Sequence, residues 1–375
     1  MLMMSTTAPV HTPALCLPAE PAVARLQAAF APAPGYLNAA TLGLPPQRVV
    51  DALQAALLDW QAGRASATGY DELVQQARAL YARFVGVPRE WVAVGSQTSV
   101  FAGMVASSLP DGAEVLCVEG DFSSMVFPFL VAAQQAGRGI TVRQVPLDQV
   151  AAAISERTTL VAFSLAQSAC GSLCDGAAIT AAAKAVGALT FCDLTQAAGW
   201  LPVDAGDYDL TVCSAYKWMC QPRGTAYLTV RPELLERLRP VNAGWYAGDE
   251  IWASCYGPAM SLAGDARRFD VSPAWLSWAG AVPALEVLAL APTEAVRDHD
   301  VALADGLREC LGLPTAGRPV VSLADPTGAM AQRLSERGAT IASRAGRVRI
   351  AFHIWNTPAD VDLVADALDG MPVTA

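Results

Sequence analysis

Between residues 91 and 230, short apolar runs alternate with segments whose apolar residues recur at helical spacing. The short runs predict strands at 91–94, 114–118, 140–145, 159–164, 189–192, 210–213 and 225–230. The segments between them predict helices at 98–109, 125–135, 147–154 and 177–186. This alternation predicts an α/β fold, in which right-handed crossovers build a mostly parallel seven-stranded sheet flanked by helices.

The pattern differs on either side of this stretch. Before it, helical spacing predicts helices at 47–60 and 70–84. After it, we expect a short helix, an irregular segment rich in Gly, Trp and Tyr, and two long helices, at 234–238, 241–272, 273–290 and 294–311. A strand, a helix, a second strand and a final helix are predicted at 320–323, 328–336, 348–352 and 359–368. The chain therefore divides into an N-terminal arm that joins the small domain (1–46), a large domain (47–272), and a linking helix with a small C-terminal α/β domain (273–375).

Composition narrows the class of protein. Of the 375 residues, 53% are hydrophobic and 16% are charged, which is enough apolar surface for a large core. The net charge of −10 without a basic stripe argues against a nucleic-acid partner. Cys170 and Cys174 form the one short cysteine spacing without a second pair or a histidine cluster, so we expect no metal site. The first residues resemble no signal peptide and no long apolar run occurs, so we expect a cytoplasmic protein without a membrane span.

Polar side chains follow several of the predicted strands. In sheets of this kind ligands bind beyond the carboxyl ends of the strands, so these positions are candidates for a binding site. Thr98 and Ser99 begin a helix and suit a phosphate, although an ordinary helix cap would use the same residues. The other candidates at strand ends are Phe122, Gln167, Asp193, Gln196, Ser214, Tyr216 and Lys217.

Lys217 is the most informative of them. Most lysines are solvated, but Lys217 lies in the apolar run 211–219, which holds no other charge. A buried lysine has a lowered pKa and forms imines readily. Asp193, at the end of the preceding strand, can keep a pyridine nitrogen protonated. This layout is typical of a pyridoxal-phosphate site, in which the lysine holds the aldehyde as a Schiff base.

At this point the chain resembles the class V aminotransferases, a group of fold-type I pyridoxal-phosphate enzymes that includes kynureninases, cysteine desulfurases and isopenicillin-N epimerase-like proteins. The resemblance spans roughly residues 36–370. Its strongest segments are Tyr-Leu-Asn-Ala-Ala-Thr-Leu-Gly (36–43), 193–196, 214–217, and Arg-Ile-Ala-Phe-His-Ile-Trp-Asn-Thr (349–357).

The resemblance implies roles for individual residues. Lys217 would hold pyridoxal 5′-phosphate, Asp193 would pair with its pyridinium nitrogen, and Gln196 would lie near its phenolic oxygen. Phe122 would stack on the ring, and Arg349 would take the substrate α-carboxylate. The phosphate would be cradled by Thr98 and Ser99, with further contacts from Ser214 and Tyr216. Substrate contacts are expected from Asn38 and Gln167. Trp245, in a Gly-Trp segment similar to that of kynureninases, would reach the phosphate of the neighbouring subunit, which implies a homodimer with sites at the interface.

The reaction stays open at this stage. Cysteine desulfurases carry a nucleophilic cysteine shortly before the equivalent of Arg349, and residues 339–348 contain none. Kynureninases usually have a histidine where Gln196 stands. We expect an enzyme that acts on an α-amino acid through a Cα carbanion, with side-chain cleavage by a lyase or a kynureninase-like hydrolase favoured. Transamination or epimerisation is the alternative within the family, and a non-catalytic cofactor-binding or regulatory protein is the alternative outside it.

Overall fold

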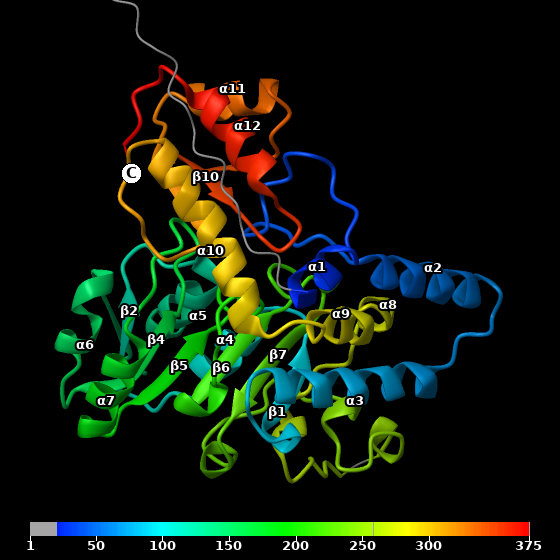
Figure 1. Cartoon of the computed structure of the whole chain (residues 1–375). Coiled ribbons are helices and arrows are strands. Elements are labelled where there is room, and N and C mark those ends of the chain that lie inside the picture. Colours follow the sequence, from blue (N-terminus) through cyan, green and yellow to red (C-terminus); the bar gives the residue numbers. More distant parts are fainter. Residues whose placement is uncertain (1–20, 258, 375) are drawn as a thin grey trace, which may run out of the picture.

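The computed structural model describes residues 21–257 and 259–374 (Figure 1). The first 20 residues of the predicted N-terminal arm lie outside the described residues. A seven-stranded sheet has the order β1-β7-β6-β5-β4-β2-β3, and β7 runs antiparallel to both of its neighbours. Its strands are β1 (Val92–Gly95), β2 (Glu114–Val118), β3 (Thr141–Val145), β4 (Thr158–Ser164), β5 (Leu189–Asp193), β6 (Leu210–Ser214) and β7 (Ala226–Val230). The mostly parallel sheet predicted from the sequence is confirmed.

The sheet is covered on both faces because its strands are apolar at successive positions. In β2, Val115 and Cys117 pack on one face while Leu116 and Val118 pack on the other. Helices α4 (Thr98–Ser108) and α5 (Ser123–Ala133) cover the first face. The second face is covered by α3 (Ala67–Phe84), α6 (Val150–Ala153), α7 (Gly176–Val186) and α9 (Ala281–Leu288).

A second, three-stranded sheet forms the small domain at the top of Figure 1, with the order β8-β10-β9. Its elements are β8 (Val320–Ala324), α11 (Ala329–Glu336), β9 (Ala342–Arg344), β10 (Arg347–Ala351) and α12 (Pro358–Leu368). Helix α10 (Thr293–Cys310) crosses from the large sheet to this domain (Figure 1). Leu37 is buried in the core of the small domain, and Tyr36 and Asn38 form bridges to Thr340 and Ala351.

Three predictions about the helices were wrong. The helix expected at 273–290 is broken into α8 (Trp275–Ala279) and α9 at Gly280, where a Cβ would lie 2.5 Å from the Pro222 ring. The helix expected at 234–238 is only a 3₁₀ turn at Pro232–Leu234. The helix expected at 147–154 is a 3₁₀ turn followed by the short α6. In the two shorter segments, one or two helical turns of apolar spacing were too little to decide a continuous helix.

The remaining described helices are α1 (Pro21–Gln27) and α2 (Gln47–Gln61). Among the described residues, no single helix is long and apolar enough to cross a membrane. Two consecutive segments, Trp275–Leu288 and Thr293–Cys310, reach that length and composition only when they are taken together, and they are bent by 84° relative to each other.

Candidate active site

A cavity of about 290 Å³ lies at the carboxyl ends of the central strands, between the large sheet and the small domain. The predicted residues that line it are Thr98, Phe122, Asp193, Gln196, Ser214, Tyr216, Lys217 and Arg349. The first and last of them in the chain, Thr98 and Arg349, are 251 positions apart. The tertiary fold therefore brings together eight of the twelve residues singled out from the sequence.

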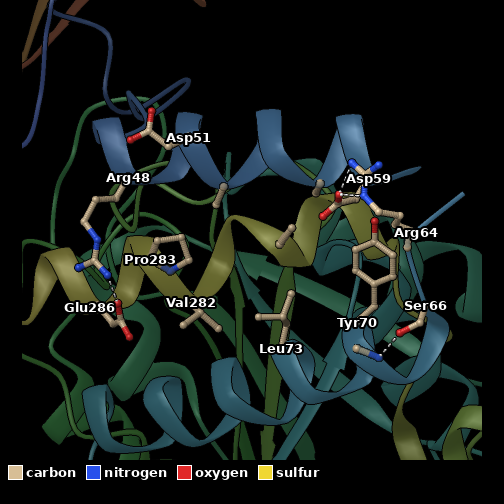
Figure 2. Close-up of a pocket in the computed structure, with 15 residues that line it drawn as sticks. Arg48, Asp51, Asp59, Arg64, Ser66, Tyr70, Leu73, Val282, Pro283 and Glu286 are labelled. Carbon is tan, nitrogen blue, oxygen red and sulfur yellow. Dashed lines mark hydrogen bonds and ion pairs between the residues drawn. The ribbon is translucent and has the colours of Figure 1, made fainter. Parts of the chain in front are cut away.

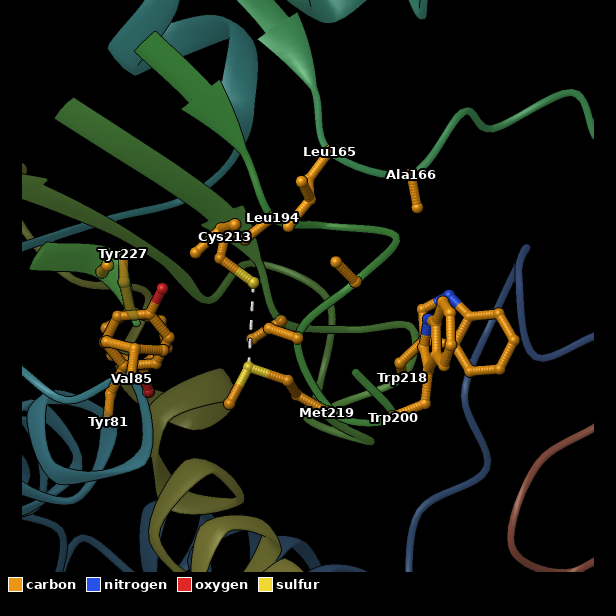
Figure 3. Packing of buried hydrophobic residues seen from close by; sticks show 14 of the residues in the cluster. Tyr81, Val85, Leu165, Ala166, Leu194, Trp200, Cys213, Trp218, Met219 and Tyr227 are labelled. Atoms are coloured by element: carbon orange, nitrogen blue, oxygen red, sulfur yellow. Dashed lines mark hydrogen bonds between the residues drawn. The ribbon is translucent and has the colours of Figure 1, made fainter. Parts of the chain in front are cut away.

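Lys217 follows β6 on a tightly packed loop. Gly43 donates its N–H to the Tyr216 carbonyl at 2.9 Å, and a Cβ at this glycine would lie 1.8 Å from the Lys217 carbonyl oxygen. Figure 3 shows Trp218 and Met219 anchored in the core beside this loop, and the Met219 sulfur lies 3.7 Å from the Cys213 thiol. These contacts fix the backbone of the loop, so protein packing sets the direction of the Lys217 side chain.

The Lys217 ammonium is buried without a carboxylate in contact. Among the described residues it has no ion-pair partner, and its Nζ lies 5.1 Å from the centroid of the Phe122 ring. Burial, opposed by the charge of Asp193 and assisted by those of Arg349 and Arg344, lowers the pKa of Lys217 to about 8. A lysine with this pKa exchanges its proton near neutral pH, as imine formation and proton transfer require.

Asp193 lies at the end of β5 beneath the cavity. One carboxylate oxygen accepts a hydrogen bond from the Thr195 amide at 2.8 Å, and no partner in the described part of the chain engages the other oxygen. Burial raises the pKa of Asp193 to about 6, against the opposing effects of Thr195 and Lys217. A protonated heteroaromatic nitrogen bound in this cavity would stabilise the carboxylate further.

Three hydroxyl groups meet at the start of α4. Thr98 Oγ1 lies 2.9 Å from Ser214 Oγ and 3.3 Å from Thr195 Oγ1, and the Ser214 amide donates to Thr195 Oγ1 at 2.9 Å. The amino terminus of an 11-residue helix adds the positive end of its dipole. Together these donors suit a phosphate group.

Arg349 enters the cavity from β10 of the small domain. Its guanidinium donates to Thr41 Oγ1 at 2.6 Å and to the Ser168 carbonyl, both neutral acceptors. Its buried Nε has no partner among the residues that the structure describes. Burial, helped by Arg344, lowers the pKa of Arg349 to about 10. An arginine in this state has donors left for an anion that enters the cavity.

Gln196 lines the cavity, but its amide is already engaged. Its Nε2 donates to the Ala40 carbonyl at 3.0 Å and to Ser168 Oγ at 3.1 Å, and its Oε1 accepts from the Trp218 indole at 2.7 Å. The structure therefore places this amide between three protein segments, where it holds the Lys217 loop.

Four predicted residues do not line the cavity. Ser99 is one residue further round α4, a rotation of about 100°, and faces a groove between α4 and α5. Gln167 is buried and donates to the Ser164 carbonyl at 3.1 Å. Asn38 pairs with Ala351 at the edge of the small domain. Trp245 packs against Tyr246 and Trp252, with ring centroids 5.3 and 5.1 Å away.

The structure adds cavity residues that the sequence analysis missed. Thr41, Ser168, Thr195, Arg223 and Arg344 all line the cavity. Thr41 lies in the 36–43 segment and Ser168 in the polar turn after β4, so both had a sequence signal. Arg344 ends a short edge strand, β9, that the sequence analysis did not predict, and the Ala-Gly pair at 345–346 was the available turn signal.

A larger groove lies away from these strand ends. It measures about 600 Å³ and runs between α2, α3 and α9 (Figure 2). Its charged groups are already paired, as Arg48 with Glu286 and Arg64 with Asp59. Among the residues described, the groove is lined by no lysine, cysteine or histidine and by no unpaired buried charge, so the strand-end cavity is the candidate active site.

Comparison with known proteins agrees with this geometry. The model of the class V aminotransferase family matches residues 36–317, which is more than half of the chain. The chain belongs to the class V aminotransferase family. An uncharacterized aminotransferase of Bacillus subtilis is 26% identical over 80% of this chain and 85% of its own length. The kynureninase of Deinococcus radiodurans is 29% identical over 72% of this chain and 69% of its own length.

Solved structures show the same fold at lower identity. A cystine C–S lyase in complex with its product, cysteine persulfide, superposes with a TM-score of 0.81 at 22% identity, over 90% of this chain and 98% of that chain. In another structure of that lyase, glycine is covalently linked to the pyridoxal-phosphate cofactor. The protein is thus a fold-type I α/β protein of a pyridoxal-phosphate enzyme family.

The residues of the cavity fit this cofactor. Lys217 offers a buried amine without a competing partner, Asp193 a buried carboxylate, and Phe122 an aromatic face beside the amine. Thr98 and Ser214 would hold the phosphate at the α4 terminus. Bound there, pyridoxal 5′-phosphate supplies an electron sink for charge that develops at a substrate Cα.

Proposed function

We propose that this enzyme acts on an α-amino acid and cleaves its side chain, as a lyase or a kynureninase-like hydrolase. One observation carries the proposal: a buried lysine with a lowered pKa and a buried arginine without a carboxylate partner line the same cavity. Arg349 binds the substrate α-carboxylate, for which its planar guanidinium is well suited. The substrate Cα is thereby held beside Lys217.

Lys217 moves the proton at Cα. Its pKa of about 8 leaves a fraction of the amine neutral near pH 7, so it accepts the Cα proton and returns it as a general acid. Asp193 would hold a proton on the ring nitrogen of the bound cofactor, and its buried position would strengthen that interaction. Arg344 and Arg349 of the small domain line the same cavity as these groups.

Side-chain cleavage is favoured by two features. Phe122 lies beside the lysine as an aromatic stacker, and the kynureninase and C–S lyase similarities concern enzymes that break side-chain bonds. No cysteine lines the cavity among the described residues, which disfavours a persulfide on the enzyme. Transamination is the second candidate, favoured by the similarity to the Bacillus subtilis aminotransferase, and epimerisation is a third.

A non-catalytic cofactor-binding protein is the alternative of another class. Such a protein needs the lysine and the phosphate site but gains nothing from a buried, unpaired Arg349, which costs free energy in the folded chain. The presence of Lys217, Asp193 and Arg349 in one cavity therefore favours an enzyme.

We also propose a homodimer with its sites at the interface. The segment after β7 exposes large apolar side chains, including Tyr256, which is 94% exposed, and Met260, which is 78% exposed. Trp245 packs within this segment, where a partner subunit could meet it. Sedimentation velocity of the purified protein measures the oligomeric state directly.

Product analysis tests the reaction. The holoenzyme is incubated with a panel of amino acids, and keto acid, ammonia, sulfide and released side-chain products are measured. Side-chain cleavage gives a released fragment, transamination gives keto acid without ammonia once an α-keto acid is added to accept the amino group, and epimerisation gives only the other enantiomer. Asp193→Ala should keep most cofactor binding, seen in the visible spectrum, yet lose about 100-fold or more in turnover. Full turnover in this variant would contradict the role of Asp193.

A further inference from the structure

The hairpin β9–β10 carries a second arginine into the active-site cavity. Arg344 and Arg347 are paired across the hairpin, as are Ala342 and Arg349. Ala345 and Gly346 form the turn between them, and both have positive φ, 48° and 70°. This is the geometry of a two-residue hairpin turn that matches the twist of the strands. The hairpin therefore holds Arg344 at a fixed position relative to Arg349.

These arginines share one face of the small sheet. Arg344 is the diagonal neighbour of Arg349 across the strand pair, a spacing of about 7–8 Å that is within reach of long side chains. Arg347 is on the same face but is engaged by Ser322, to which its Nε and Nη2 donate at 2.8 Å each. Arg344 donates only to the neighbouring Ser343 carbonyl at 2.9 Å.

The charges that line the cavity do not balance. Lys217, Arg223, Arg344 and Arg349 line it together with a single carboxylate, Asp193. In the described part of the chain, no carboxylate forms an ion pair with any of the three arginines. The phosphate site at the start of α4 belongs to the large domain, and Arg223 lies on that domain over the Tyr216 ring, 5.0 Å from its centroid. Arg344 lies instead in the small domain beside Arg349, and its charge lowers the pKa of both Arg349 and Lys217.

One α-carboxylate satisfies Arg349 and leaves Arg344 without an anion. We propose that Arg344 binds a second carboxylate at the end of the substrate side chain, so that the substrates are acidic α-amino acids. This proposal rests on the proposed function in that Arg349 takes the α-carboxylate. Arginine suits the task because its guanidinium fork pairs with carboxylate in a fixed orientation.

Binding of unreactive acids tests the proposal without requiring turnover. Isothermal titration of the holoenzyme compares succinate, which has two carboxylates, with butyrate, which has one. Succinate should bind about tenfold or more tightly than butyrate. Arg344→Gln should weaken succinate about tenfold and change butyrate by less than about twofold, whereas Arg349→Gln should weaken both. Arg337→Gln, the same charge change at an exposed site of the small domain, should alter neither.

Equal affinities for the two acids, or an unchanged preference in Arg344→Gln, would overturn the proposal. The proposal would also be overturned if the preference for succinate over butyrate were lost in Arg223→Gln but kept in Arg344→Gln. A second readout is kcat/KM for aspartate and glutamate against asparagine and glutamine, a preference that Arg344→Gln should abolish. If diacid selectivity depends on Arg344 but no amino acid is processed, the proposed function fails and the binding site stands. If amino acids are processed without diacid selectivity, the proposed function stands and the second carboxylate site fails.

Discussion

Arg78 and Arg349 are buried to the same degree, 1% and 2% exposed, yet their surroundings differ. Arg78, on α3, forms two hydrogen bonds with Asp270, at 2.6 and 3.1 Å, and donates to the Val92 carbonyl. Burial lowers its pKa, but the charge of Asp270 outweighs this and the pKa is raised. Arg349 has only neutral acceptors, and burial lowers its pKa to about 10.

The difference separates a structural charge from a functional one. The cost of removing Arg78 from water is offset within the chain, where the pair ties α3 and the segment after β7 to strand β1. The corresponding cost at Arg349 is left uncompensated until an anion arrives. Substitutions in the two regions should therefore affect different observables, stability in the first and activity in the second.

The largest effect is expected at Lys217, in the cavity where Arg349 has no charged partner. Lys217→Ala should reduce turnover by about 100- to 10,000-fold, because both the amine that holds the cofactor and the proton carrier are lost. Borohydride reduction should no longer fix the cofactor to the chain, as measured by intact-protein mass spectrometry. Lys184→Ala, at an exposed site on α7, is the matched control and should retain both properties. Trapping that persists in Lys217→Ala would refute the assignment.

Arg78→Gln should cost about 3–5 kcal/mol of unfolding free energy, because Asp270 stays buried without its partner. Urea unfolding followed by fluorescence measures this. Arg83→Gln, at an exposed position on the same helix, should change stability by less than about 0.5 kcal/mol. The folded fraction of Arg78→Gln should keep its kcat. Equal stability of the two variants would remove the distinction between the two regions.

Arg349→Gln should show the opposite behaviour. Its kcat/KM should fall about 100-fold, equivalent to ~2.7 kcal/mol, because the α-carboxylate loses its charged partner. Its melting temperature should be equal or higher, since an unpaired buried charge is removed. Differential scanning calorimetry and steady-state kinetics on the same preparations check both. A fall in melting temperature comparable to that of Arg78→Gln would show that Arg349 is structural.

His353 extends the comparison to pH and should give the smallest effect. It is completely buried against Asp300, with its Nδ1 2.8 Å from the carboxylate, and its Nε2 lies 2.9 Å from the Trp218 carbonyl beside Lys217. Burial lowers the pKa of His353, but Asp300 outweighs burial and raises it from 6.5 to about 10. The pair therefore stabilises the fold fully below about pH 6.5, and this contribution is lost as the pH rises through about 10.

The test is the pH dependence of unfolding free energy between pH 6 and 10. It is best measured in the Lys217→Ala background, because the lowered pKa of Lys217 gives an opposite slope above pH 8. The decline should amount to a few kcal/mol at most. His353→Gln should abolish the part of the decline between about pH 6.5 and 8, below the range in which the buried thiols Cys117 and Cys174 contribute. An unchanged slope in that variant would assign the pH dependence to other groups.

The sequence was sufficient for the parts of the site that depend on local pattern. Alternating apolar runs gave the order of strands and helices in the large domain, and Asp193 and Lys217 follow strands whose carboxyl ends must meet at one edge of a parallel sheet. The segments 36–43 and 349–357 carried enough residues to indicate the family, which the match over 36–317 confirms.

Other features depended on contacts between distant segments. Ser99 and Thr98 look alike in sequence, but the rotation of α4 directs only Thr98 into the cavity. Gly280 lies between α8 and α9, where Pro222 packs too closely for a side chain. The sequence by itself determined the positions of Asp193 and Lys217, since burial pattern and strand ends are local properties. Only the tertiary structure decided which charges are paired, because this depends on packing between elements far apart in the chain. Such packing brings Asp270 to Arg78, and it brings Arg344 to the cavity.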